Sequence, residues 1–175
     1  MDSLISENYI ILNSELHKNN LQYGTSTIKY KHIIINLINK YNFKSVIDYG
    51  CGKQVAKTFL PTNIKYIPYD PAFQELNILP EPSDFLICTD VLEHIEPQYL
   101  DNVLKSINDK TLKICFLTIA LRQAKKILSD GRNAHLIVKP KSFWIEKINN
   151  NFTNYKIIHE EYVENNFLNL TIKKL

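Results

Sequence analysis

Glycine, cysteine and long apolar runs are all scarce in this chain of 175 residues. It holds only four glycines and three cysteines. An odd number of cysteines, with none paired at a metal-ligand spacing, argues against a disulfide framework and favours a reducing compartment. No run approaches the roughly 20 apolar residues that a membrane helix needs, and the N-terminus lacks the basic segment of a signal peptide. We therefore expect a cytoplasmic protein without a membrane partner.

The chain also lacks a strong excess of one charge. Its formal net charge is +3, and no block of like charges forms an arm for nucleic acid or anionic membranes. Nucleic acid is therefore permitted as a partner but not indicated by charge. The content of 45% hydrophobic and 22% charged residues is that of a globular protein, and this length suits one domain with a real core.

Strand and helix patterns alternate along the chain, which predicts an α/β fold. We expect a single domain (1–175), in which a helical lid (1–42) precedes an α/β core (43–175). Predicted strands cover 45–49, 64–69, 85–89, 112–119, 155–163 and 167–172. A further short strand is expected among the prolines of 71–83. The pattern predicts a doubly wound, Rossmann-like, mostly parallel seven-stranded sheet with an antiparallel C-terminal edge hairpin and helices on both faces.

The most informative motif is Asp-Tyr-Gly-Cys-Gly at residues 48–52, directly after the first predicted strand. Its two glycines lack a Cβ, so another group can approach the backbone closely. Eighteen residues after Gly52, a second apolar run ends in Asp70, whose carboxylate can accept both hydroxyls of a ribose. A strand, a glycine turn, a helix and a strand that ends in an acid are typical of the nucleotide-binding half of a doubly wound sheet.

Two later clusters carry further polar groups at the ends of predicted strands. Asp90, Glu93 and His94 follow a buried strand and should lie at the carboxyl edge of the sheet, where such folds bind ligands. His94 is the natural general base near neutral pH, although Glu93 and His94 could instead cap or pair with the next helix. The stretch 130–135, which ends in His135, is either an acceptor-binding loop or a plain surface turn.

The sequence resembles the class I S-adenosylmethionine-dependent methyltransferase superfamily, in its small, single-domain, Asp-Val-Leu-Glu-His type. The resemblance covers residues 45–120 in the expected order, and departs from the family at Gln54, where a third glycine is usual. It implies S-adenosyl-L-methionine as the cofactor. The cofactor-binding residues that it implies are Asp48, Tyr49, Gly50, Cys51, Gly52, Asp70, Pro71, Thr89, Asp90 and Val91.

The same resemblance implies methyl transfer to an O or N nucleophile of a small molecule or another acceptor. We expect His94, Glu93 and His135 to be catalytic, with no metal. Substrate specificity would depend on the turn at Tyr23 and on the connection 121–140. The acceptor and the oligomeric state are not predicted.

Two other functions stay open. Glu93, His94 and His135 also resemble the metal set of the small-RNA 2′-O-methyltransferases, which predicts metal-assisted RNA 2′-O-methylation as an alternative. Carboxylate and imidazole groups together can bind a divalent cation. A domain that binds or degrades S-adenosylmethionine without methylating is the other alternative, because one superfold hosts many activities.

Overall fold

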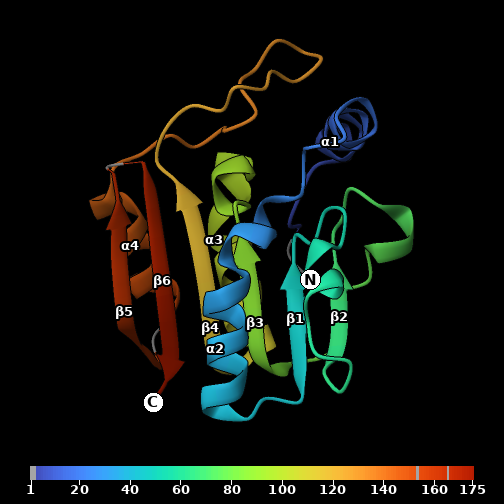
Figure 1. Cartoon of the computed structure of the whole chain (residues 1–175). Helices are drawn as coiled ribbons and strands as arrows, with labels where there is room; N and C mark the ends of the chain where they lie inside the picture. The colour runs from blue at the N-terminus through green and yellow to red at the C-terminus, as the bar shows by residue number, and fades with distance from the viewer. Residues whose placement is uncertain (1–2, 153, 165) are drawn as a thin grey trace.

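Six strands form one mixed sheet in the computed structural model, which describes residues 3–152, 154–164 and 166–175 (Figure 1). The strand order is β2-β1-β3-β4-β6-β5. The strands are β1 (Ser45–Tyr49), β2 (Lys65–Tyr69), β3 (Ser83–Thr89), β4 (Thr111–Ala120), β5 (Tyr155–Val163) and β6 (Phe167–Lys174). The first four run parallel, and β6 pairs antiparallel with both β4 and β5. The predicted α/β class and the antiparallel edge hairpin are confirmed.

The prediction of seven strands is wrong, because the described residues form only six. Residues 71–82, where a short strand was expected, contain one 3₁₀ turn at Gln74–Leu76. Pro71, Pro80 and Pro82 lie in this stretch, and proline cannot donate a hydrogen bond to a neighbouring strand. The segment therefore stays irregular, and β2 remains the edge of the sheet.

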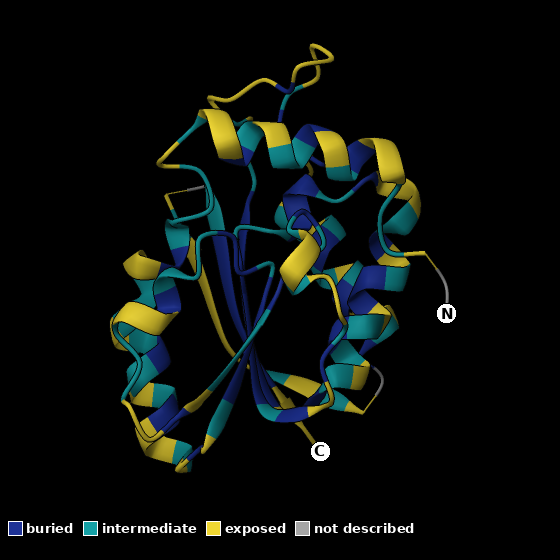
Figure 2. Cartoon of the chain, turned by 90° about the vertical axis from the view of Figure 1, so that its right-hand side faces the viewer, coloured by how far each residue is buried: buried dark blue, intermediate teal, exposed yellow. Residues whose placement is uncertain are grey.

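Helices cover both faces of the sheet (Figure 2). The α-helices are α1 (Glu7–Asn19), α2 (Lys31–Tyr41), α3 (Leu100–Lys110) and α4 (Lys141–Asn151). Successive strand residues point to opposite faces, so Val46 packs with Ile34 and Ile38 of α2, whereas Ile47 belongs to the core that contains Trp144 of α4. None of the helices described is both long enough and apolar enough to cross a membrane.

Helix α1 lies across the carboxyl edge of the sheet rather than on either face (Figures 1 and 2). Its N-cap is Ser6, whose Oγ accepts a hydrogen bond from the Tyr9 N–H. Glu96 accepts two further hydrogen bonds, from the backbone N–H and the hydroxyl of Ser6. Tyr9 and Leu12 pack with Leu128 of the connection after β4. Of the predicted lid, α2 therefore packs on the sheet, while α1 lies over its edge.

Gln54 takes the left-handed backbone conformation (φ 54°) at the position of the family's third glycine. A side chain in this region costs about 1–2 kcal/mol. We expect Gln54→Gly to raise the free energy of unfolding by about 1 kcal/mol, and Gln54→Ala to give no gain. Urea unfolding should show a higher midpoint for the glycine variant at an unchanged slope. An equal or lower midpoint would mean that this turn is not strained.

Candidate functional site

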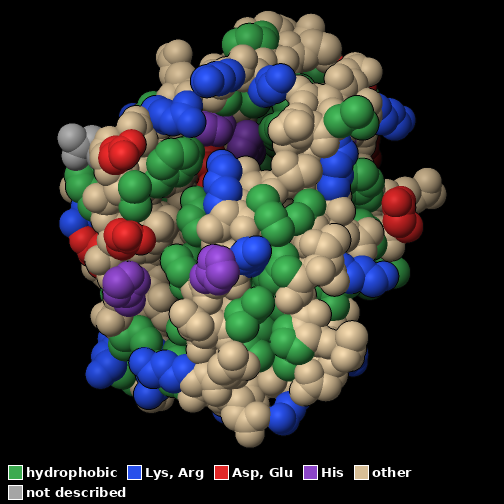
Figure 3. Space-filling view, in the orientation of Figure 1, with side chains coloured by type: hydrophobic (Ala, Val, Ile, Leu, Met, Phe, Trp, Pro, Cys, Tyr) green, Lys and Arg blue, Asp and Glu red, His purple; other side chains and the backbone are tan. Residues whose placement is uncertain are grey.

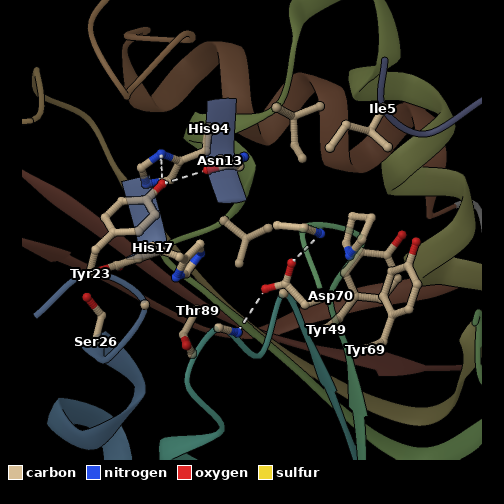
Figure 4. A pocket seen from close by; sticks show the side chains of 18 of the residues that line it. Ile5, Asn13, His17, Tyr23, Ser26, Tyr49, Tyr69, Asp70, Thr89 and His94 are labelled. Carbon is tan, nitrogen blue, oxygen red and sulfur yellow. Dashed lines mark hydrogen bonds between the residues drawn. The ribbon is translucent and has the colours of Figure 1, made fainter. Parts of the chain in front are cut away.

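A pocket lies at the carboxyl edge of the sheet, beneath α1 (Figure 4). It lies where β1 is flanked by β2 and β3, the point at which the strand order reverses and open α/β sheets bind ligands. The predicted cofactor residues that line it are Tyr49, Gly50, Gly52, Asp70, Pro71, Thr89, Asp90 and Val91. Asp48 and Cys51 are buried and do not line the pocket. The sequence motifs thus converge on one cavity.

Asp70 follows β2 and places a nearly buried carboxylate at the pocket wall (Figure 4). Its Oδ2 accepts a hydrogen bond from the Gly52 N–H at 2.8 Å, and its Oδ1 accepts one from the Ala72 N–H at 2.9 Å. Burial raises the pKa of this carboxyl, and the two N–H donors oppose that rise. A carboxylate has about four acceptor positions, so two remain for hydroxyl donors in the pocket.

The glycine turn is closely packed against other parts of the chain. Gly50 and Gly52 have φ values of 77° and 49°. A Cβ on Gly50 would lie 2.4 Å from Val91 Cγ2, and a Cβ on Gly52 would lie 2.7 Å from the Gly24 carbonyl oxygen. The Lys53 N–H also donates to the Gly24 carbonyl at 3.1 Å. A side chain at either position would collide with Val91 or with the Gly24 backbone. Both positions therefore require glycine for packing within the protein.

Asp48 lies outside the pocket and contacts Tyr66, although the sequence analysis placed it among the cofactor-binding residues. Its side chain is buried, and its Oδ2 accepts a hydrogen bond from the Tyr66 hydroxyl at 2.8 Å. Burial raises the pKa of Asp48 to about 7, and the hydrogen bond from Tyr66 only partly offsets this rise. Because Asp48 lies outside the pocket, its carboxyl has a structural role, as the acceptor for the Tyr66 hydroxyl.

The raised pKa of Asp48 predicts a pH-dependent difference in stability. The carboxyl has an ordinary pKa of 3.8 when unfolded and about 7 when folded. Its favourable contribution is therefore complete below the ordinary pKa and is lost as pH rises to about 7. Relative to the wild type, Asp48→Asn should gain stability with rising pH across this window, by at most about 1.4 kcal/mol per pH unit. Urea unfolding across this window measures it, and a constant difference contradicts the shift.

The roof of the pocket comes from α1 and the turn that follows it (Figure 4). The Tyr23 hydroxyl lies 3.1 Å from both Asn13 Oδ1 and His94 Nδ1. The His17 ring packs 4.6 Å from the Tyr23 ring, and burial lowers the pKa of His17 to about 4. The sequence had singled out Tyr23 but missed Asn13 and His17. Their role depends on contacts with residues far along the chain, which no local spacing reveals.

Glu93 is fully buried in the 3₁₀ turn Leu92–His94, just after β3. Its Oε1 accepts a hydrogen bond from the Ala120 N–H at 2.8 Å, at the end of β4. Its Oε2 has no hydrogen-bond partner among the described residues. Burial and the charge of Asp90 raise the pKa of Glu93 well above its ordinary value. A buried, unpaired carboxylate oxygen is costly, so its retention points to a ligand or a proton.

The structure brings Glu93, His94 and His135 together, as the sequence predicted for the carboxyl edge. One ligand-type atom from each lies within 4.8 Å of the others, and the two imidazole centroids are 4.7 Å apart. His94 lines the pocket, whereas Glu93 and His135 do not. Of the three side chains, His94 is therefore the one that contacts the pocket.

Hydrogen bonds hold both imidazole rings in place. The Tyr23 hydroxyl donates to Asn13 Oδ1 and lies 3.1 Å from His94 Nδ1, and the Ala134 carbonyl also accepts a hydrogen bond from the His94 ring. The Arg122 carbonyl can only accept, so Nδ1–H of His135 donates to it at 2.6 Å. In the neutral ring, Nε2 of His135 then carries a lone pair. Burial lowers the pKa of His94 to about 3, so its ring is neutral near pH 7.

Strand order, the glycine turn and the acids at the switch point together define a class: the chain has the fold of class I S-adenosylmethionine-dependent methyltransferases. Among similar solved structures is the 1,6-didemethyltoxoflavin-N1-methyltransferase of Burkholderia thailandensis, with bound S-adenosylhomocysteine. It is 13% identical with a TM-score of 0.67, over 99% of this chain and 93% of that one. No protein-family model and no curated protein sequence matches the chain.

Two further similar structures have different acceptors. The magnesium protoporphyrin IX methyltransferase of Synechocystis, with bound S-adenosylmethionine, is 12% identical with a TM-score of 0.61, over all of both chains. The 16S rRNA methylase ArmA is 13% identical with a TM-score of 0.55, over 92% of this chain and 90% of that one. These identities establish a common fold alone, and the acceptors of these proteins differ widely.

Proposed function

We propose that the pocket binds S-adenosyl-L-methionine and that the protein transfers its methyl group to an O or N nucleophile. The observation that carries this proposal is the Asp70 carboxylate, which faces the pocket beside the glycine turn with two acceptor positions left for ribose hydroxyls. The similar structures with bound S-adenosylmethionine and S-adenosylhomocysteine support it.

The residues of this chain would act mainly by alignment. Asp70 holds the ribose, and Thr89, Asp90 and Val91 line the wall beside the methyl donor. A sulfonium is already an activated donor, so holding the acceptor in line supplies most of the acceleration. Where the acceptor must lose a proton, His94 is the imidazole that lines the pocket and would accept it.

Calorimetry with S-adenosylmethionine tests cofactor binding, and product analysis tests the reaction. S-adenosylhomocysteine that forms only when an acceptor is added supports methyl transfer. Cleavage products that form without any acceptor would instead support the other alternative, a domain that degrades the cofactor. A wild-type protein that does not bind S-adenosylmethionine would contradict both.

A second candidate, cation-assisted methyl transfer, is favoured by one observation. Glu93 has an unpaired Oε2 and offers a carboxylate oxygen within 4.8 Å of a ring nitrogen of each imidazole, and each Nδ1 contacts a second group, as is usual for metal-ligating histidines. A carboxylate and two imidazole nitrogens fit Zn²⁺, Mn²⁺ or Co²⁺. A cation bound there would lower the pKa of an acceptor hydroxyl. The comparisons do not favour RNA over a small molecule as its acceptor.

A further inference from the structure

The excess positive charge of the chain is concentrated in one segment. Residues 121–140 contain five basic residues against one acidic residue, whereas the rest of the chain has 16 basic and 17 acidic residues. The five basic residues are Arg122, Lys125, Lys126, Arg132 and Lys139, and all are exposed. The mild net charge of +3 therefore conceals a strongly basic connection between β4 and α4.

Most of this charge is not neutralised by nearby carboxylates. Arg132 pairs with Asp130 at 2.7 Å. The other four basic side chains form no ion pair with any residue that the structure describes. Unpaired cations on one loop attract an anion more strongly than the same charges spread over the surface.

Two cations lie against the same aromatic ring, and one of them lies beside a residue that lines the pocket. The Arg122 guanidinium is 5.2 Å from the centre of the Phe167 ring, and the Lys29 ammonium is 5.9 Å from the same ring. Lys29 also lies 4.0 Å from Asp90, which lines the pocket, and the Arg122 carbonyl accepts from His135. Figure 3 shows basic side chains around a hollow in which histidine is visible.

We propose that the methyl acceptor carries a phosphate group, which binds to Arg122 and Lys29 beside the pocket. This inference rests on the proposed function and names its substrate class. The guanidinium fork matches phosphate oxygens in a bidentate manner, and an ammonium adds a point charge. A neutral or cationic acceptor would leave the Arg122 guanidinium without an anionic partner. The phosphate would hold the acceptor with its nucleophile toward His94.

Binding of phosphorylated probes to the full chain tests this. The probes are the four 5′-mononucleotides and a short mixed-sequence single-stranded RNA, with the four uncharged nucleosides for comparison. At low salt we expect phosphorylated probes to bind at least about tenfold more tightly than nucleosides. The double variant Arg122→Gln, Lys29→Gln should lose at least about tenfold in this affinity. The matched control Lys65→Gln, Lys105→Gln removes two exposed charges elsewhere and should stay within about twofold.

Each outcome decides between the alternatives. Tight binding of mononucleotides indicates a small phosphate ester as the acceptor, and tight binding of RNA alone indicates a nucleic-acid strand. Equal binding of nucleosides and nucleotides would overturn the proposal, as would equal losses in the double variant and its control. S-adenosylhomocysteine binding is measured on the same samples. Its absence beside intact phosphate binding would overturn the proposed function and the acceptor role, while the anion site itself would stand.

Discussion

Replacing Asp70 with alanine should weaken the binding of S-adenosylmethionine by about 100-fold or more. The carboxylate is the only anionic group that we assign to the ribose, and each hydrogen bond to a charged group contributes about 1.5–3 kcal/mol. The same substitution leaves the Gly52 and Ala72 N–H groups unpaired, so the turn itself also loosens. Isothermal calorimetry measures the loss directly.

Two further variants separate binding from folding. Asp70→Asn keeps a carbonyl oxygen for one of the two backbone donors, so it should remain folded and still bind weakly. Asp48→Asn removes a buried carboxyl that lies outside the pocket and should bind within about threefold of the wild type. If Asp48→Asn lost as much affinity as Asp70→Asn, the assignment of Asp70 to the ribose would be wrong.

Under the second candidate function, replacing Glu93 with glutamine should weaken divalent-cation binding by at least about 100-fold. The amide keeps the shape of the buried side chain and the acceptor for the Ala120 N–H, but it cannot supply the carboxylate that a bound cation requires. Titration with Co²⁺, followed by visible absorption, measures cation binding to the cluster independently of any methyl transfer. His94→Gln should cause a loss of similar size.

Matched controls keep this prediction specific. Glu146→Gln and His159→Gln change an exposed acid and an exposed histidine far along the chain, and should leave Co²⁺ binding unchanged. A wild-type chain that binds no Co²⁺ would contradict the second candidate function. Affinity that is equal in the wild type and Glu93→Gln would show that the cation binds elsewhere.

Much of the fold follows from local sequence patterns. The β1 prediction, 45–49, matches the observed Ser45–Tyr49, because the β-branched run ends sharply at a glycine turn. The C-terminal hairpin was predicted from two apolar stretches joined by a polar turn, and its strands start where predicted. The seventh strand was wrong, because family expectation outweighed three prolines that the sequence itself displays.

The site was predictable where it depended on strand ends. Asp70, Asp90 and His94 follow strands that meet at one edge of the sheet, so topology alone brings them to the pocket. The burial of Asp48 against Tyr66 was not predicted, because the orientation of a side chain at the end of a buried strand depends on the packing around it. Pocket residues from α1, such as His17, could not be predicted, since the docking angle of a separate helix has no local signal.

A crystal structure of the chain with S-adenosylhomocysteine tests the central claim most directly. The account predicts that both ribose hydroxyls donate to Asp70 and that the sulfur lies beside the wall formed by Thr89–Val91, on the same side as His94. Ligand bound away from Asp70, or with its sulfur on the side opposite His94, would contradict the account.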